Sequence, residues 1–400
     1  MMKQIKWFTA IMCLPCVAYA SFIESTIGTA VVNDATATYF NPAALVLMKN
    51  SQVITQGTYA YFHNEFSGQT TSVFPSITQS GNASTNTRYF SPSLYLATPT
   101  NSRIITGLAF VSNSANRDAE QNSILRYVQA SNSVQDYDLV PAIAVRITDA
   151  FSLGGGVNFS YANFHLKPII GFPGSNVADS QSNNQSDGTG YGINAGFLYK
   201  PTAQTVLGFN YRSITTYHLS GTSTYNGTPQ VISNRYHYLS RTPARSVFSI
   251  NHFFTQTFGL IATIQRIQWS AITNMHINGI ANVVGSTPVI LNATVPYYLN
   301  DTWLATLGSH YRITPKWILR VAGTYSQTPG NPHYQITNGD SFILGASTGY
   351  EIDKVVTIDG SYAHGFIKNQ NINITGGRFL INGVNEAARD AISVKLTFNL

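Results

Sequence analysis

Charged side chains are scarce in this sequence of 400 residues: Asp, Glu, Lys and Arg make up 10% of it, whereas a soluble domain usually carries about 25%. A surface so poor in charge argues against a cytosolic enzyme. Beyond residue 20 there is also no apolar run of about 18 residues, which excludes a helical membrane protein. Aromatic residues reach 12%, too many for a disordered chain. The composition favours a membrane β-barrel, whose strands meet lipid on one face and water on the other.

Cysteine is nearly absent, and both cysteines, Cys13 and Cys16, fall in residues 1–20. That stretch is typical of a secretory signal peptide, with a basic start, an apolar centre and the cleavage pattern Ala18-Tyr19-Ala20. Without cysteine the mature chain can form no disulfide and no thiolate metal site, and it has no cysteine nucleophile. The formal charge of +6 is small and unclustered, so we expect no nucleic-acid partner.

From residue 51 onward the sequence alternates between apolar and small or polar residues, the pattern of a strand with one buried face. The last strand, for example, places Ile392, Val394 and Leu396 on one face and Ser393 and Lys395 on the other. We therefore predict an all-β fold, a transmembrane antiparallel barrel of about 14 strands. The predicted strands are 51–63, 88–98, 103–112, 137–147, 151–165, 189–200, 203–219, 244–255, 257–270, 302–313, 315–326, 341–351, 354–366 and 388–400.

The predicted connections alternate between short and long, as in outer-membrane barrels with short periplasmic turns and long outer loops. A soluble β-sandwich has no reason to keep this alternation. In an outer-membrane barrel, the alternation would place both chain ends on the periplasmic side. The residues before the first strand could then enter the lumen. The long connections are 64–87, 113–136, 166–188, 220–243, 271–301, 327–340 and 367–387.

No group of residues predicts catalysis. Residues 345–349 match G-x-S-x-G, but that motif requires a sharp turn between a strand and a helix, and here it lies inside an alternating strand. The nine histidines are scattered, without the spacing of a metal site. We expect no enzyme activity, no metal and no cofactor.

Basic residues are predicted to point into the lumen from several strands. Arg212, Arg320 and His310 are the candidate ligand-binding residues, since a guanidinium pairs well with a carboxylate. A structural alternative is that the inward cations pair with residues of the N-terminal segment such as Glu24 and Asp34. The inward cations are Arg146, Arg212, Arg312, Arg320 and Lys395, and Asp359 is an inward acid.

Residues 30–45, AVVNDATATYFNPAAL, resemble the N-terminal hatch of the FadL/TodX family of outer-membrane transporters for long-chain fatty acids and hydrocarbons. Residues 139–156, 207–221 and 303–366 are similar to later parts of the same family. The resemblance covers the mature chain, and the family is known by its ordered series of motifs more than by Asn41-Pro42-Ala43 alone.

The resemblance implies a fourteen-stranded barrel, residues 51–400, plugged by a hatch of residues 21–50, in which Asn41, Pro42 and Ala43 hold the hatch. It also implies passive uptake of hydrophobic molecules, with hatch rearrangement and lateral exit near a kinked third strand. Gly107 is the candidate kink position, because glycine within a strand often marks a bulge. The location would be the outer membrane of a Gram-negative bacterium, with membrane lipid, lipopolysaccharide and the barrel assembly machinery as partners.

The predicted function is therefore outer-membrane transport of long-chain fatty acids or similar hydrophobic compounds. An aromatic hydrocarbon channel would share nearly all of these features and would lack only the need for a lumen cation. A structural or adhesive barrel, a general porin and an outer-membrane esterase are further alternatives. A porin would conduct ions well, and an esterase would need a Ser/His/Asp set that the sequence does not show.

Overall fold

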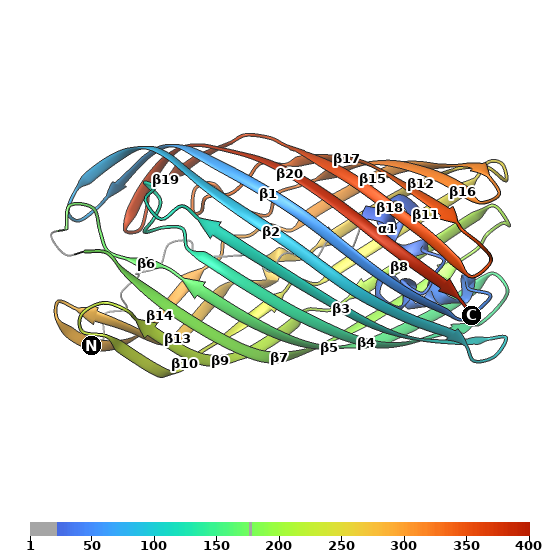
Figure 1. Cartoon of the computed structure of the whole chain (residues 1–400), viewed down its shortest axis with the longest axis horizontal. Coiled ribbons are helices and arrows are strands. Elements are labelled where there is room, and N and C mark those ends of the chain that lie inside the picture. The colour runs from blue at the N-terminus through green and yellow to red at the C-terminus, as the bar shows by residue number, and fades with distance from the viewer. Residues whose placement is uncertain (1–21, 176–177) are drawn as a thin grey trace.

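The computed structural model describes residues 22–175 and 178–400. The predicted signal peptide, residues 1–20, lies outside the described residues. The rest forms one closed antiparallel barrel, because β1 (Gln52–Ser72) pairs along its whole length with β20 (Phe379–Asn399) (Figure 1). No helix in the described part of the chain is long and apolar enough to cross a membrane.

The barrel contains fourteen strands, as the sequence predicts, although some are interrupted and carry two labels. The pairs β8 and β9, β10 and β11, β12 and β13, and β14 and β15 each follow one line of the wall, while β6 and β19 are short additions. The remaining elements are β2 (Ile77–Pro99), β3 (Ile104–Ala119), β4 (Ser131–Arg146), β5 (Phe151–Lys167), β6 (Ile169–Ile170), β7 (Ser180–Tyr199), β8 (Thr205–Arg212), β9 (Thr215–Tyr225), β10 (Val231–Thr242), β11 (Arg245–Phe253), β12 (Phe258–Ile267), η3 (Trp269–Ala271), β13 (Asn274–Val284), β14 (Thr287–Pro296), β15 (Thr302–Thr314), β16 (Trp317–Ser326), β17 (Ser341–Glu351), β18 (Val356–Ile367) and β19 (Gln370–Ile374).

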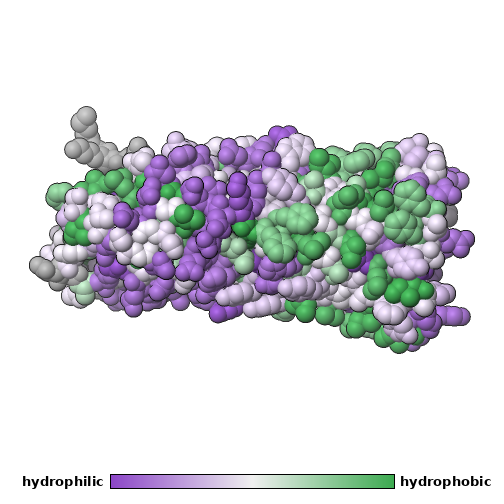
Figure 2. All heavy atoms as spheres, turned by 90° about the horizontal axis from the view of Figure 1, so that it is seen from above, coloured by the Kyte–Doolittle hydropathy of each residue, from purple (hydrophilic) through white to green (hydrophobic). Residues whose placement is uncertain are grey.

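An apolar band surrounds the half of the barrel that carries the short turns and the C-terminus. Large apolar side chains such as Ile193, Leu307 and Ile392 are more than half exposed there, and Figure 2 shows them gathered over that half, with hydrophilic residues over much of the other. Exposure of so much apolar surface is unfavourable in water and favourable in lipid. The band therefore marks the part of the wall that lies in the membrane.

The prediction of long loops is wrong for much of the other half of the barrel. β1 has 21 residues and β2 has 23, while a membrane needs only about 9–11 residues per strand. Only residues 73–76 connect β1 to β2, so most of 64–87 is strand, and 220–243 and 271–301 are mostly strand as well. These extensions lie beyond the membrane, where both faces of the wall can be polar. Apolar alternation is lost in these extensions, so strands predicted from that alternation end before the strands of the structure do.

The N-terminal segment, residues 22–48, lies inside the barrel at the end with the short turns (Figure 1). It consists of α1 (Phe22–Ile27), η1 (Thr29–Val31), α2 (Ala37–Phe40) and η2 (Pro42–Leu47). η1 lies against β8 and β11, and η2 against β4, β5 and β7. The segment supplies most of the largest buried apolar cluster, together with inward residues of the wall.

Glycines let the backbone of this segment approach the wall closely. A Cβ at Gly154 would overlap the backbone of Pro42 and Ala43, and one at Gly208 would overlap the Ala30 carbonyl. At Gly107 and Gly196 a Cβ would instead overlap the side chains of Thr38 and Asn41. β3, β5, β7 and β8 therefore form a seat for residues 29–48 that only glycine allows.

We expect Gly154→Ala to destabilise the protein by about 1–3 kcal/mol, because the added methyl group pushes η2 off the wall. Gly155→Ala is the matched control, since its Cβ would meet nothing closer than the Asn194 carbonyl at 3.4 Å. The measurement is the urea midpoint of unfolding in lipid vesicles. Equal midpoints for the two variants would contradict the close packing of η2.

Candidate functional site

A cavity of about 400 Å³ lies in the lumen, on the outer side of the N-terminal segment. This volume falls within the usual range for small-molecule sites, about 300–1,000 Å³. Polar groups also border the cavity, among them the charged side chains of Arg117, Asp136 and Arg389. Its large apolar lining residues include Phe22, Phe62, Phe90, Phe164, Trp269 and Leu304.

A smaller hollow of about 40 Å³, the throat, adjoins the cavity beside the end of β14. It shares Arg117, Gln129 and Ile336 with the cavity and extends to Pro296 and Tyr297 of the wall. Arg117 thus lies where throat and cavity meet. It forms no ion pair with any described residue, so its charge is available to a ligand.

The loop 120–130 covers part of the outer mouth. Its Leu125 and Val128 are buried in an apolar cluster with Phe66 of β1 and Ile372 of β19. Arg126 and Tyr127 of the same loop bind Asp179, at 3.2 Å for the ion pair and 2.7 Å for the hydroxyl. The cavity is therefore partly covered above by packed loop residues and bounded below by the N-terminal segment.

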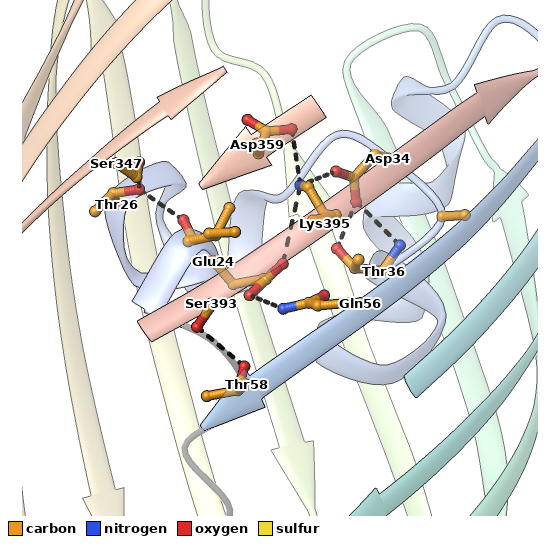
Figure 3. A network of polar contacts seen from close by, with 12 residues as sticks. Glu24, Thr26, Asp34, Thr36, Gln56, Thr58, Ser347, Asp359, Ser393 and Lys395 are labelled. Atoms are coloured by element: carbon orange, nitrogen blue, oxygen red, sulfur yellow. Dashed lines mark hydrogen bonds and ion pairs between the residues drawn. The ribbon is translucent and has the colours of Figure 1, made fainter. Parts of the chain in front are cut away.

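On the β20 side, charged groups hold the N-terminal segment. The Lys395 ammonium of β20 lies 2.8 Å from Asp34 and 3.9 Å from both Glu24 and Asp359 (Figure 3). Lys395 is 2% exposed and Glu24 is 1% exposed. These four residues, the Lys395 cluster, join two acids of the segment to a cation of the wall. The structural alternative, pairing of inward cations with Glu24 and Asp34, is realised at Lys395.

Burial would raise the pKa of the Asp34 carboxyl, but the charge of Lys395 and hydrogen bonds from Lys395 and Thr36 lower it below its ordinary value. A carboxyl with a lowered pKa stabilises the folded state above its unfolded pKa, about 3.9. That stability is lost as the pH falls through the lower folded value. We expect Asp34→Asn to lower the urea midpoint at pH 7 and pH 5, with the difference shrinking as the pH falls below the unfolded pKa of about 3.9. A difference that stays constant with pH would contradict the ion pair.

Arg212 also holds the segment and does not border the cavity. Its Nη2 donates to the Tyr39 carbonyl at 2.8 Å, its Nη1 lies 3.7 Å from Asp138, and its guanidinium lies 3.8 Å from the centre of the Tyr39 ring. The Asp138 carboxylate also accepts a bond from Ser160. These contacts occupy both terminal nitrogens, while Nε has no hydrogen-bond partner among the described residues. The guanidinium is buried against Tyr39, so a ligand role for Arg212 would require the segment to move.

Arg320 and His310 are neighbours across β15 and β16, since His310 pairs with Arg320 in the ladder. Arg320 forms a 3.0 Å ion pair with Asp359, and His310 packs against Phe253 at 4.9 Å between ring centres. Neither residue lines the cavity. Arg320 instead borders a second hollow of about 240 Å³, the vestibule, on the other side of α1.

Asn41, Pro42 and Ala43 lie where the segment touches the wall. The Asn41 side-chain amide donates to the Ala30 carbonyl at 2.7 Å and to the Phe197 carbonyl of β7 at 3.2 Å, while its Oδ1 accepts from the Ala43 N–H.

Gly107, the candidate kink position, pairs regularly with Ala97 of β2 and Ala142 of β4. The pairing of β3 with β2 is interrupted at another place, between the pairs Phe90–Ser114 and Ser93–Val111. Pro92 lies in this gap and has no N–H to donate.

Sequence reasoning missed Arg117 and Asp136, which do border the cavity. Both fall in 113–136, which was predicted to be a loop, yet they belong to β3 and β4. Val111 and Ala115 point inward, and Arg117 lies on the same face because side chains alternate along a strand. This alternation is the signal in the sequence that could have identified Arg117 as a lumen residue. Ser347 of the G-x-S-x-G match lies within β17 and shares a hydrogen bond with Thr26.

A closed barrel with an apolar outer band, a filled lumen and an apolar cavity defines the class of outer-membrane transport barrels. The chain belongs to the family of outer membrane transport proteins described as OMPP1/FadL/TodX, whose family model matches residues 25–398. This confirms the resemblance and the location in the outer membrane of a Gram-negative bacterium.

Individual relatives are distant in sequence and close in fold. Outer membrane protein P1 of Haemophilus influenzae is 23% identical over 380 residues, covering 84% of this chain and 81% of that protein. A Pseudomonas aeruginosa FadL homologue superposes with a TM-score of 0.80 at 20% identity, covering 93% of this chain and 95% of the other. The Pseudomonas putida toluene transporter TodX superposes with a TM-score of 0.71 at 16% identity, covering 99% and 100%. The chain therefore shares the fold of these proteins and, as a member of the family, is an outer-membrane transport protein.

Proposed function

We propose that this protein takes up long-chain fatty acids, or similar molecules with an apolar tail and an anionic head, by passive diffusion. The position of Arg117 is the observation that supports this proposal most directly. Its cation lies at the junction of throat and cavity and has no acidic partner among the described residues. A neutral hydrocarbon would gain nothing from a charge there, whereas a carboxylate forms a charge-assisted hydrogen bond.

The transport path begins at the throat and continues into the cavity, where Phe62, Phe164 and Trp269 receive the tail. The N-terminal segment fills the lumen below, so onward passage needs it to rearrange as a hatch. Lateral exit near β3 remains a prediction, and the ladder gap beside Pro92 is its candidate position. The wall would contact membrane lipid and lipopolysaccharide after insertion by the barrel assembly machinery.

Neutral aromatic hydrocarbons are the second candidate substrates, because aromatic side chains such as Phe22, Phe90 and Trp269 line the cavity. Such a substrate would use the apolar lining and leave Arg117 without a role. Catalysis is not part of the proposal. Ser347 lies within a strand and is 4% exposed, which does not fit a nucleophile on a sharp turn.

We expect Arg117→Gln to lower uptake of labelled oleate by about tenfold or more, since a hydrogen bond to a charged group contributes about 1.5–3 kcal/mol. Uptake of toluene should not change. Arg88→Gln is the matched control: Arg88 lies on the neighbouring strand β2, and its 2.8 Å ion pair with Asp118 is exposed. An unchanged rate of oleate uptake in Arg117→Gln would remove the observation on which the proposal rests.

A further inference from the structure

Basic side chains gather on the outward face of three neighbouring strands, beyond the apolar band. β9, β10 and β13 lie side by side in the half of the barrel away from the C-terminus (Figure 1). Along β10, alternate residues from 235 to 241 are exposed, while Tyr236 and Tyr238 between them are buried. The outward basic residues, here called the basic patch, are Arg235, His237 and Arg241 of β10, His218 of β9 and His276 of β13.

The register between the strands makes the basic patch one continuous surface. His218 pairs with Leu239, the outward residue next to His237 on β10. His237 in turn pairs with Asn278 of β13, and His276 lies two positions from Asn278 on the same face of its strand. The five basic side chains therefore occupy adjacent outward positions, although they come from residues as far apart in the sequence as 218 and 276.

The basic patch borders the apolar band on its outer side. His218 pairs with Thr189 of β7, and the next outward residues of β7 toward the short turns, Tyr191 and Ile193, are 65% and 55% exposed. These two side chains belong to the band, so the patch lies where the membrane head groups begin. In the outer leaflet of an outer membrane these head groups are those of lipopolysaccharide, whose lipid A phosphates lie just above its acyl chains.

The two arginines of the patch are not neutralised by the protein. Neither Arg235 nor Arg241 forms an ion pair with any described residue, and Arg241 makes a 3.5 Å contact with a backbone carbonyl of η3. Of the acids nearby, Asp301 is held by Arg266 at 2.8 Å, and Asp187 of β7 is separated from β10 by β9. The patch therefore presents a net positive charge to the head groups.

Negative charge lies on a different part of the outer wall. Glu65 of β1 and Glu386 of β20 are exposed and pair with each other in the ladder, beyond the apolar band. Two like charges placed side by side repel an anion that approaches them. The outward charges of the barrel therefore favour an anionic lipid beside β9, β10 and β13 and disfavour one beside β1 and β20.

We propose that the basic patch binds the phosphate groups of a lipopolysaccharide molecule in the outer leaflet. A guanidinium matches the geometry of a phosphate and forms two parallel, charge-assisted hydrogen bonds with it, and the histidines of the patch supply further ring nitrogens. The acyl chains of the same molecule lie against Tyr191 and Ile193 below the patch. This site goes beyond the proposed function, since it does not depend on which substrate is transported.

Lipid bound at the patch holds a part of the wall that also borders the throat. On the inner face of the same strands, Tyr236 and Tyr238 of β10 and Met275 of β13 pack in one apolar cluster with Val295, and Val295 lines the throat. A ligand that binds only the folded state raises its stability. Lipopolysaccharide should therefore raise the urea midpoint of unfolding of the wild-type barrel.

The test titrates purified lipopolysaccharide into the purified full chain in detergent micelles and reads the bound fraction by native mass spectrometry. The variant is Arg235→Gln with Arg241→Gln, and we expect its Kd to be about tenfold higher or more, because it loses charge-assisted hydrogen bonds to phosphate. The matched control, Arg88→Gln with Lys167→Gln, removes two exposed cations from β2 and β5 and should bind as the wild type does. Lipopolysaccharide stripped of its lipid A phosphates should bind the wild type as weakly as intact lipopolysaccharide binds the variant.

Three results would overturn the site. The first is an unchanged Kd in the Arg235/Arg241 variant, and the second is an equal loss in the control, which would show a diffuse attraction to positive charge. The third is equal binding of intact and phosphate-free lipopolysaccharide to the wild type, a comparison that needs no variant to fold. Uptake of oleate does not enter the test, so failure of the site and failure of the proposed function are separate results.

Discussion

Replacing Lys395 with methionine is expected to detach α1 from β20 and to raise the ion conductance of the barrel. The change removes the cation that lies 2.8 Å from Asp34 and 3.9 Å from Glu24 and Asp359. Three carboxylates then face one another at a buried site, and Arg320 lies 3.0 Å from one of them, Asp359. Removing one partner of a buried ion pair typically costs about 3–5 kcal/mol. Movement of α1 relieves this cost because it carries Glu24 away.

The measurement is single-channel conductance of the purified full chain in planar bilayers. The wild-type chain should conduct poorly, since the N-terminal segment fills the lumen, and Lys395→Met should conduct several times more. Lys354→Met is the control, because Lys354 lies in an exposed turn between β17 and β18. Adding Glu24→Gln to Lys395→Met should restore part of the closed state, as expected for residues in contact. Equal conductance of Lys395→Met and wild type would contradict the role of the Lys395 cluster.

A disulfide between α1 and β17 is expected to stop transport. The hydroxyl oxygens of Thr26 and Ser347 lie 2.7 Å apart, so Thr26→Cys with Ser347→Cys places two sulfurs within reach of each other. The two natural cysteines, Cys13 and Cys16, belong to the predicted signal peptide and would not interfere in the mature chain. Oxidised, the variant should take up no oleate, because α1 can no longer leave the wall.

Reduction of the same cells should return oleate uptake to the rate of the two single-cysteine variants. Both single variants must be measured, because each removes the Thr26–Ser347 hydrogen bond without joining α1 to the wall. The fraction cross-linked is read from gel mobility with and without reductant. A fully cross-linked variant that transports oleate at the rate of the reduced one would show that α1 does not move during uptake.

The barrel could be predicted from the sequence because the membrane imposes alternation on each strand. Residues such as Ile392 and Ser393 must face lipid and lumen in turn, and this pattern located all fourteen strands where they cross the apolar band. The strand ends were not predictable in the same way. Beyond the membrane the outer faces of β1 and β2 meet water and no longer lipid, so residues 64–72 and 77–87 lack the apolar outer face that makes alternation detectable in the sequence.

The candidate site was predictable only in part. The alternation along a strand shows which side chains point inward, but it does not show which residues they contact. Lys395 and Arg320 point inward as expected, yet one holds Asp34 and the other holds Asp359. Arg117 was missed because its strand was cut short. The hydrogen bond between Thr26 and Ser347 joins residues 321 positions apart, and no pattern within one strand reveals such a contact.

The most direct test of the proposed function is uptake of labelled oleate and labelled toluene by the wild-type chain, expressed in a Gram-negative strain without a fatty-acid transporter, with surface expression verified. We expect oleate to enter well above the empty-vector rate and added unlabelled fatty acid to compete with it. A well-assembled barrel that carries toluene and leaves oleate outside would contradict the assignment of an anionic head group to Arg117, while the barrel and the family would stand.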